Sequence, residues 1–205
     1  MANMTNDAQH RPRLTPKGER TRARIVSAAA RLIRERGVAG TTLDDVRAAA
    51  EVSGSQMYHY FVDKDDLVQA VIDHQADAIV GNQRRADLGT LDGLQIWRDM
   101  IIAAAESADG MGGCPLGSLG GQLAESDPQA RALIAAGFER WSDAIGEGLR
   151  GLHAAGHLST EISPDDIAVT LLAALQGGLL LAQVQRNTRP LETAVDTLLA
   201  LITSK

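Results

Sequence analysis

Two helix-starting signals that lie close together constrain the fold of this chain more than any other feature. Thr42 is a good helix N-cap, and Asp45 follows three residues later, as in a capping box. Ser53 is a second N-cap, so the helix between the two, over residues 43–50, is short. A longer helical pattern over residues 17–36 precedes both. One long helix followed by two short helices with a tight connection predicts a helix-turn-helix.

The rest of the chain also has helical periodicity and no strand pattern. Glycine and proline mark where the expected helices end and begin. These helices cover residues 64–85, 91–108, 116–125, 128–155, 164–186 and 190–202. The predicted fold class is all-α. We expect a disordered arm over residues 1–14, an N-terminal three-helix helix-turn-helix domain over 15–64, and a C-terminal helical domain over 65–205.

Charge is distributed unevenly along the chain. The formal net charge is −6, but residues 1–36 hold nine Lys and Arg against three acids, a local charge of +6 that leaves −12 for the rest. A basic N-terminal segment on an acidic body suggests that one end of the molecule meets a polyanion such as DNA. A solvated basic helix face gives the same pattern, so charge alone leaves both interpretations open.

Composition argues against several other classes of function. The single cysteine, Cys114, excludes an intrachain disulfide and a multi-thiolate zinc site, and a reducing cytoplasm is the simplest location. The most apolar stretch, residues 167–184, includes threonine, glutamine and paired glycines, so we expect a buried helix and no membrane span. The sequence has no nucleophile elbow, phosphate loop or dinucleotide motif, so we expect no enzyme, cofactor or metal site.

The short helix after Ser53 carries side chains suited to the DNA major groove. Gln56 can pair with adenine through two hydrogen bonds, and His59 can reach a base edge or a phosphate. The hydroxyls of Tyr58 and Tyr60 can donate to phosphates. The alternative for Tyr60 is a place among the core aromatics. A purely structural protein would explain the helices but not this helix beside a basic segment.

Three ordered motifs, Thr41–Val46, Ala49–Ser53 and Tyr58–Leu67, resemble the N-terminal domain of the TetR family of repressors. The resemblance covers about Arg20 to Val71. It implies that the matching positions of the second short helix touch DNA and that Lys64 contacts the DNA backbone. The residues expected to contact operator DNA are Arg20, Arg24, Thr42, Ser55, Gln56, Tyr58, His59, Tyr60 and Lys64.

One position departs from the family pattern. Glu51 occupies the turn where the family very often has glycine. The turn must therefore accommodate a side chain and a negative charge.

The C-terminal half resembles the LmrA/YxaF-like branch of the same family. The motifs that carry this resemblance lie at residues 113–119, 123–128 and 175–182. It implies a ligand-responsive repressor of the kind often encoded beside efflux or detoxification genes. Activation of transcription remains an alternative, because an activator would bind DNA in the same way as a repressor.

The last two helices carry apolar stripes that are expected to pair about a twofold axis. A homodimer of this kind would bind a palindromic operator. The residues predicted at the dimer interface are Leu171, Leu175, Gly178, Leu179, Ala182, Val195 and Leu198. The alternative is that these helices are buried within one chain.

An effector pocket is expected among the apolar residues of the C-terminal domain. The candidates are Trp97, Met100, Met111, Cys114, Phe138, Trp141 and Gln176. They favour a mainly hydrophobic or aromatic small molecule, although each residue taken alone is also typical of ordinary core. The helix over residues 64–85 joins the two domains and is expected to act as the lever between them.

Cys114 supports a second hypothesis, release from DNA by an electrophile or oxidant. It lies in a glycine-rich loop before a helix, where an N-terminus can lower a thiol pKa. No Lys, Arg or His lies within five residues of it, which favours the alternative of an inert buried thiol.

Overall fold

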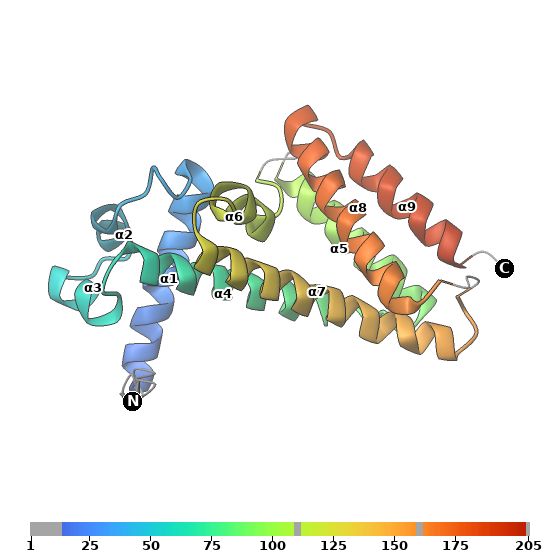
Figure 1. Ribbon diagram of the computed structural model, residues 1–205, viewed down its shortest axis with the longest axis horizontal. Coiled ribbons are helices and arrows are strands. Elements are labelled where there is room, and N and C mark those ends of the chain that lie inside the picture. The colour runs from blue at the N-terminus through green and yellow to red at the C-terminus, as the bar shows by residue number, and fades with distance from the viewer. Residues whose placement is uncertain (1–13, 109–111, 159–161, 204–205) are drawn as a thin grey trace, which may run out of the picture.

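The computed structural model describes residues 14–108, 112–158 and 162–203. All the regular structure in these residues is helical (Figure 1). The helices are α1 (Pro16–Arg36), α2 (Leu43–Ala49), α3 (Gly54–Tyr60), α4 (Lys64–Gln83), α5 (Leu91–Ser107), α6 (Pro115–Leu123), α7 (Pro128–Ala154), α8 (Pro164–Gln185) and α9 (Arg189–Thr203). The predicted all-α class is confirmed, and the predicted helix limits agree with these within two residues.

Helices α1 to α3 form a small unit around one apolar core. α1 begins after Thr15, whose Oγ1 accepts a hydrogen bond from the Gly18 N–H at 3.2 Å. The core side chains supplied by the three helices and their connections include Ile25, Ala29, Val46, Val52, Met57 and Phe61. Phe61 is 0% exposed. Burial of a side chain of this size contributes about 1.5–3 kcal/mol to folding.

Helix α4 connects this unit to the other helices. It packs on α1 and also runs along α7, so it contacts both parts of the chain (Figure 1). Its N-cap is Asp63, whose Oδ1 accepts from the Asp66 N–H at 2.8 Å. The domain limit predicted at residues 64 and 65 falls in the first turn of this helix.

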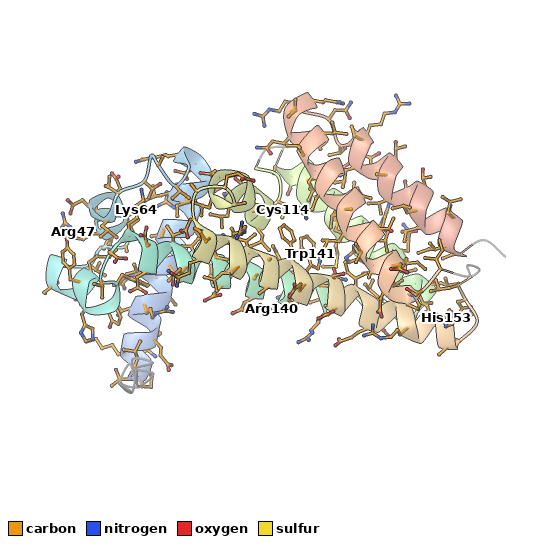
Figure 2. The ribbon with its side chains drawn as sticks, viewed as in Figure 1. Arg47, Lys64, Cys114, Arg140, Trp141 and His153 are labelled. Carbon is orange, nitrogen blue, oxygen red and sulfur yellow. The ribbon has the colours of Figure 1, made fainter. Side chains whose placement is uncertain are left out.

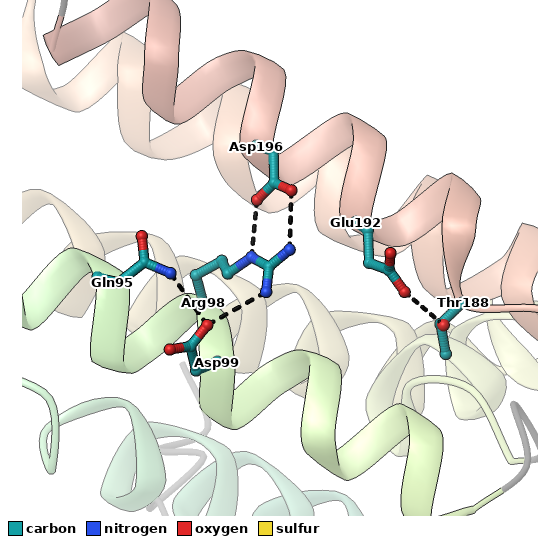
Figure 3. A network of polar contacts seen from close by, with 6 residues as sticks. All are labelled: Gln95, Arg98, Asp99, Thr188, Glu192 and Asp196. Carbon is teal, nitrogen blue, oxygen red and sulfur yellow. Dashed lines mark hydrogen bonds and ion pairs between the residues drawn. The ribbon is translucent and has the colours of Figure 1, made fainter.

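The C-terminal helices pack as a bundle in which α8 lies against both α7 and α9. A second connection joins α5 to α9 (Figure 3). There the Arg98 guanidinium donates two hydrogen bonds to the Asp196 carboxylate, at 2.7 and 2.8 Å. The same guanidinium donates to Asp99 at 3.2 Å. Two parallel bonds of this kind fix the angle between the groups as well as their distance.

Helix α6 touches the N-terminal unit directly. The Val38 N–H, in the loop after α1, donates to Gln122 Oε1 at 2.8 Å. Gln122 is held in place because its Nε2 donates to the Ser118 carbonyl at 3.1 Å. A movement of α6 can therefore reach the loop that precedes α2.

Most of the residues predicted for the dimer interface are covered by their own chain, and the interface itself stays a prediction. The buried ones are Leu171, Leu175, Gly178, Ala182 and Val195, while Leu179 and Leu198 are half-buried. A Cβ on Gly178 would lie 2.9 Å from the Leu191 Cα, so this glycine lets α9 of the same chain approach α8. The apolar stripe of α8 is the contact with α7 and α9, and its periodicity does not distinguish that contact from one with a second copy.

The outward face of α8 is also apolar. Its exposed side chains include Val169, Leu180, Leu181 and Val184. By length and composition only, α8 is apolar enough to cross a membrane, with a mean hydropathy of 1.9 over 18 residues, as core helices of soluble proteins also can be.

Candidate nucleic-acid interface and effector cavity

Helix α3 presents one polar, exposed face. Ser55, Gln56 and His59 are exposed on it, and the Tyr58 side chain is 65% exposed. The opposite face is anchored in the core by Met57, which is 1% exposed. The sequence therefore folds this segment so that the predicted reading residues point away from the protein, where a DNA groove can reach them.

Gln56 has a structural task that the sequence analysis missed. The Ser53 N–H donates to Gln56 Oε1 at 2.9 Å, and the Gln56 N–H donates to Ser53 Oγ at 3.2 Å. The two residues thus form a capping box at the start of α3. The amide oxygen of Gln56 is engaged there, so its Nε2 is the atom left to approach a base.

Thr42 is engaged in a similar way at the start of α2. Its Oγ1 accepts from the Asp45 N–H at 3.1 Å, and its own N–H donates to Asp45 Oδ2 at 3.0 Å. Hydrogen bonds from Thr42, assisted by the charge of Arg36, hold the pKa of Asp45 below its ordinary value. The hydroxyl of Thr42 is therefore already used in the cap. A phosphate would instead contact the exposed N-terminal end of α2.

Tyr60 lies between the two positions considered for it. The residue is half-buried and packs on the core, and its ring meets His59 edge-on at 5.0 Å between centroids. Its hydroxyl oxygen lies 3.4 Å from the place that a Cβ on Gly18 would occupy. The ring therefore packs α3 against the start of α1.

The basic residues lie on α1 and at the start of α4. Arg20 and Arg24 are exposed, one turn apart on α1, and Lys64 is half-buried at the first position of α4. Figure 2 shows Lys64 near the α2–α3 end of the molecule. The Arg22 guanidinium lies 5.3 Å from the centroid of the Phe61 ring, so this arginine stabilises the core rather than extending the basic surface.

The turn between α2 and α3 adopts the conformation that favours glycine. Glu51 has a φ of 52°, in the left-handed region. A residue with a Cβ costs about 1–2 kcal/mol there. The departure from glycine noted in the sequence is thus a point of backbone strain.

A cavity of about 850 Å³ lies among α4, α5, α7 and α8. Its wall also includes the start of α6 and two residues at the end of α1, Arg34 and Glu35. The apolar lining comes mainly from Ile79, Trp97, Ile101, Trp141, Leu175 and Leu179. A volume of this size suits a drug-sized molecule.

The cavity brings together four of the residues predicted for the effector site. Trp97, Met100, Cys114 and Trp141 line it, and Figure 2 shows Cys114 and Trp141 in the region bounded by α6, α7 and α8. Two other predicted residues are not in the lining and support it from behind. Phe138 stacks on Trp141 with ring centroids 6.5 Å apart, and the Gln176 amide lies beside Cys114. Met111 lies outside the described residues.

Sequence reasoning missed the most buried polar group of the cavity wall, Gln83. This residue is 5% exposed, and its Oε1 accepts from the indole N–H of Trp97 at 2.7 Å and of Trp141 at 3.1 Å. A signal was present, because Gln83 continues the apolar stripe of Ala76 and Val80 on α4. A polar residue on such a stripe marks a buried hydrogen bond.

Cys114 is the N-cap of α6 as well as part of the cavity wall. Its Sγ accepts from the Gly117 N–H at 3.3 Å. Burial raises the pKa of the Cys114 thiol, and this outweighs the hydrogen bond from the Gly117 N–H, which lowers it. Less of the thiol is therefore ionised at neutral pH than for an ordinary cysteine.

An outward-facing short helix after a tight turn, joined to a helical bundle that lines a cavity, defines a helix-turn-helix protein. Residues 25–71 match the family described as "Bacterial regulatory proteins, tetR family", and residues 90–197 match "Transcriptional regulator LmrA/YxaF-like, C-terminal domain". The chain belongs to the TetR family of transcriptional regulators, and it is not an enzyme.

Individual relatives agree with this assignment. An uncharacterized HTH-type transcriptional regulator of Mycobacterium tuberculosis is 31% identical over 183 residues, which cover 83% of this chain and 88% of the relative. The transcriptional repressor DhaR of a Mycobacterium species is 26% identical, with 83% and 86% covered. The crystal structure of a TetR regulator from Chloroflexus aurantiacus superimposes with a TM-score of 0.77 at 27% identity, covering 93% of this chain and 98% of that one.

Proposed function

We propose that this regulator is a repressor that binds palindromic operator DNA as a homodimer and is released by a small, mainly hydrophobic or aromatic molecule. The observation that carries the proposal is the composition of the cavity wall. Arg34 and Glu35 belong to α1, the first helix of the DNA-binding unit, yet they line the same cavity as Trp97 and Trp141 of the bundle. A molecule in the cavity is thus in reach of the helix that supports α2 and α3.

The homodimer is proposed to form through the outward face of α8 together with the exposed part of α9. Val169, Leu180, Leu181 and Val184 on α8, and Leu201 on α9, are exposed apolar side chains. A second copy would cover them and place two α3 helices on successive major grooves, about 34–36 Å apart. The cytoplasm, where the DNA is, is the proposed location.

Release requires only that the small molecule favours a conformer in which the two α3 helices no longer match the operator half-sites. A differential affinity of a few kcal/mol between conformers is enough for this. α4 is one path for the change because it packs on both α1 and α7. α6 is a second path, since it starts at Cys114 in the cavity wall and ends near Gln122, which holds Val38.

Operator binding is tested by titration of fluorescent duplex DNA from immediately upstream of the protein's own gene, beside a scrambled duplex, at several salt concentrations. We expect tight, salt-dependent binding to the native duplex. His59→Ala, which removes an exposed side chain of α3, should weaken specific binding with little effect on folding. The absence of binding to any duplex at low salt contradicts the repressor proposal.

Modification of Cys114 remains the alternative trigger, and its raised pKa argues against it. Cys114→Ser keeps an oxygen that can cap α6 but removes the nucleophile. If a small molecule is the trigger, this variant is still released by it, although a changed wall residue can alter the concentration needed, and electrophiles at matched concentration release neither protein. Release of the wild type alone by an electrophile would support the alternative.

A further inference from the structure

We propose that Gln83 is the polar anchor of the cavity, and that the effector is a neutral molecule that offers a hydrogen-bond acceptor, such as a ketone, ester or amide carbonyl, to the Gln83 amide nitrogen. This inference rests on the proposed function of the cavity as an effector site. It adds the chemical class of the ligand, which the apolar lining alone does not give.

The orientation of the Gln83 side chain follows from its two neighbours. The indole N–H groups of Trp97 and Trp141 point at one amide atom, at 2.7 and 3.1 Å. An indole N–H can only donate, so that atom must be the oxygen. A flipped amide would set two donors against the NH₂ group. The two tryptophans, on α5 and α7, thereby use both acceptor positions of the oxygen and leave the nitrogen for another partner.

That nitrogen has no partner in the described part of the protein. Gln83 Nε2 is buried and makes no hydrogen bond, although its side chain lies in the wall of the cavity. The nitrogen is covered by protein even when the cavity is empty, so a hydrocarbon ligand leaves the donor unpaired. A ligand acceptor that reaches Nε2 would satisfy it, so the acceptor is favoured about tenfold to a hundredfold over a matched group without one.

The distribution of charge in the wall favours a neutral ligand. The ionisable groups with charged side chains, Arg34, Glu35 and Arg85, are exposed and lie on the solvent side of the cavity. The groups shown to contact Gln83 in the wall are the two indoles, and the lining also includes buried aliphatic side chains such as Leu175. An ion placed there would lose its hydration without a counter-charge, which is costly.

The chain supplies its own reporter for the test. It has only two tryptophans, and both donate to Gln83. Intrinsic tryptophan fluorescence therefore reports events at the anchor. Cyclooctanone and cyclooctane are suitable probes, because they differ by one carbonyl in place of one CH₂ and do not carry an aromatic ring that would absorb in the same range.

The experiment compares dissociation constants of both probes for the full-length wild type and for Gln83→Glu above the pKa of the introduced carboxyl, where the carboxylate still accepts from both indole N–H groups but has no donor. Comparing the ratio of the two constants between the two proteins cancels the cost of taking the ketone from water. We expect Gln83→Glu to weaken cyclooctanone about tenfold to a hundredfold relative to cyclooctane. Leu179→Ala, which removes part of the apolar wall, should weaken both probes and leave the ratio unchanged.

An infrared measurement on the wild type does not depend on any variant. The carbonyl band of bound cyclooctanone should shift to lower wavenumber than in hexane, as for a hydrogen-bonded ketone. An unshifted band, a ratio that Gln83→Glu changes by less than about threefold, or no binding of either probe would each overturn the inference. The DNA titration is carried out without ligand, so any of these outcomes leaves operator binding to be judged separately.

Discussion

Single residues near the DNA-binding surface serve both the fold and the site. Gln56 caps α3 through its oxygen, which leaves its Nε2 as the proposed donor to a base. Glu51 holds a left-handed backbone angle in the turn that sets the position of α3. A substitution at either position therefore affects folding and DNA binding by different physical routes, and suitable pairs of variants separate them.

Replacement of Glu51 by glycine is expected to stabilise the protein. Glycine has no Cβ to strain at a φ of 52°, although it loses more backbone entropy on folding. The net gain should be about 1 kcal/mol in the free energy of unfolding, measured in urea. Glu51→Ala removes the same charge but keeps the Cβ, so it should give no such gain. Equal stabilisation by both variants would assign the effect to charge instead.

Two substitutions at Gln56 should separate its cap from its contact with DNA. Gln56→Ala removes the acceptor for the Ser53 N–H and should lower stability by about 0.5–1 kcal/mol. Gln56→Glu keeps an acceptor and matches the usual capping box, so stability should be retained. Specific operator binding should fall in both variants, because neither has the amide donor. If Gln56→Glu binds its operator as the wild type does, Gln56 does not read a base.

At the scale of elements, the helices and their order were predictable because each has its own capping residue, proline or glycine stop. The outward face of α3 was predictable too, since its polar and apolar residues alternate with the helical period. The side of α8 that stays exposed was not predictable, because this helix is apolar on nearly all sides. Leu175 is buried and Leu180 is exposed, although both are leucines of the same helix. Gln83 was missed because its two partners, Trp97 and Trp141, come from distant parts of the sequence.

The contact between α5 and α9 should make stability depend on acid pH. Arg98 donates to Asp196 and holds the pKa of that carboxyl below its ordinary value of 3.8. The stabilisation is therefore complete above that value and is lost as pH falls through the lower pKa of the folded state. It should amount to less than about 1 kcal/mol, because Asp196 is half exposed. Urea unfolding of wild type and Asp196→Asn should differ at pH 6 and converge towards pH 2; a constant difference would contradict this.

At the scale of the whole molecule, the apolar outward face of α8 is the proposed contact between two copies. Leu180→Glu should convert a dimer into monomers of 21.7 kDa, because a charge buried at the contact has no partner. Sedimentation equilibrium measures the mass, and operator affinity should fall with it. Ile96→Glu places the same charge on another exposed apolar residue, on α5, and should leave both unchanged. A wild type that sediments as a monomer would refute the proposed contact.

The part of the cavity wall that α1 contributes has a thermodynamic consequence for sensing. Coupling between two binding events is reciprocal, so the factor by which an effector weakens operator binding is also the factor by which the operator weakens effector binding. If an effector releases this protein from its operator, as we propose, the free protein binds the effector more tightly than the protein bound to its promoter does. The threshold at which the regulated gene responds is set by the DNA-bound form, and a dissociation constant measured without DNA places that threshold too low.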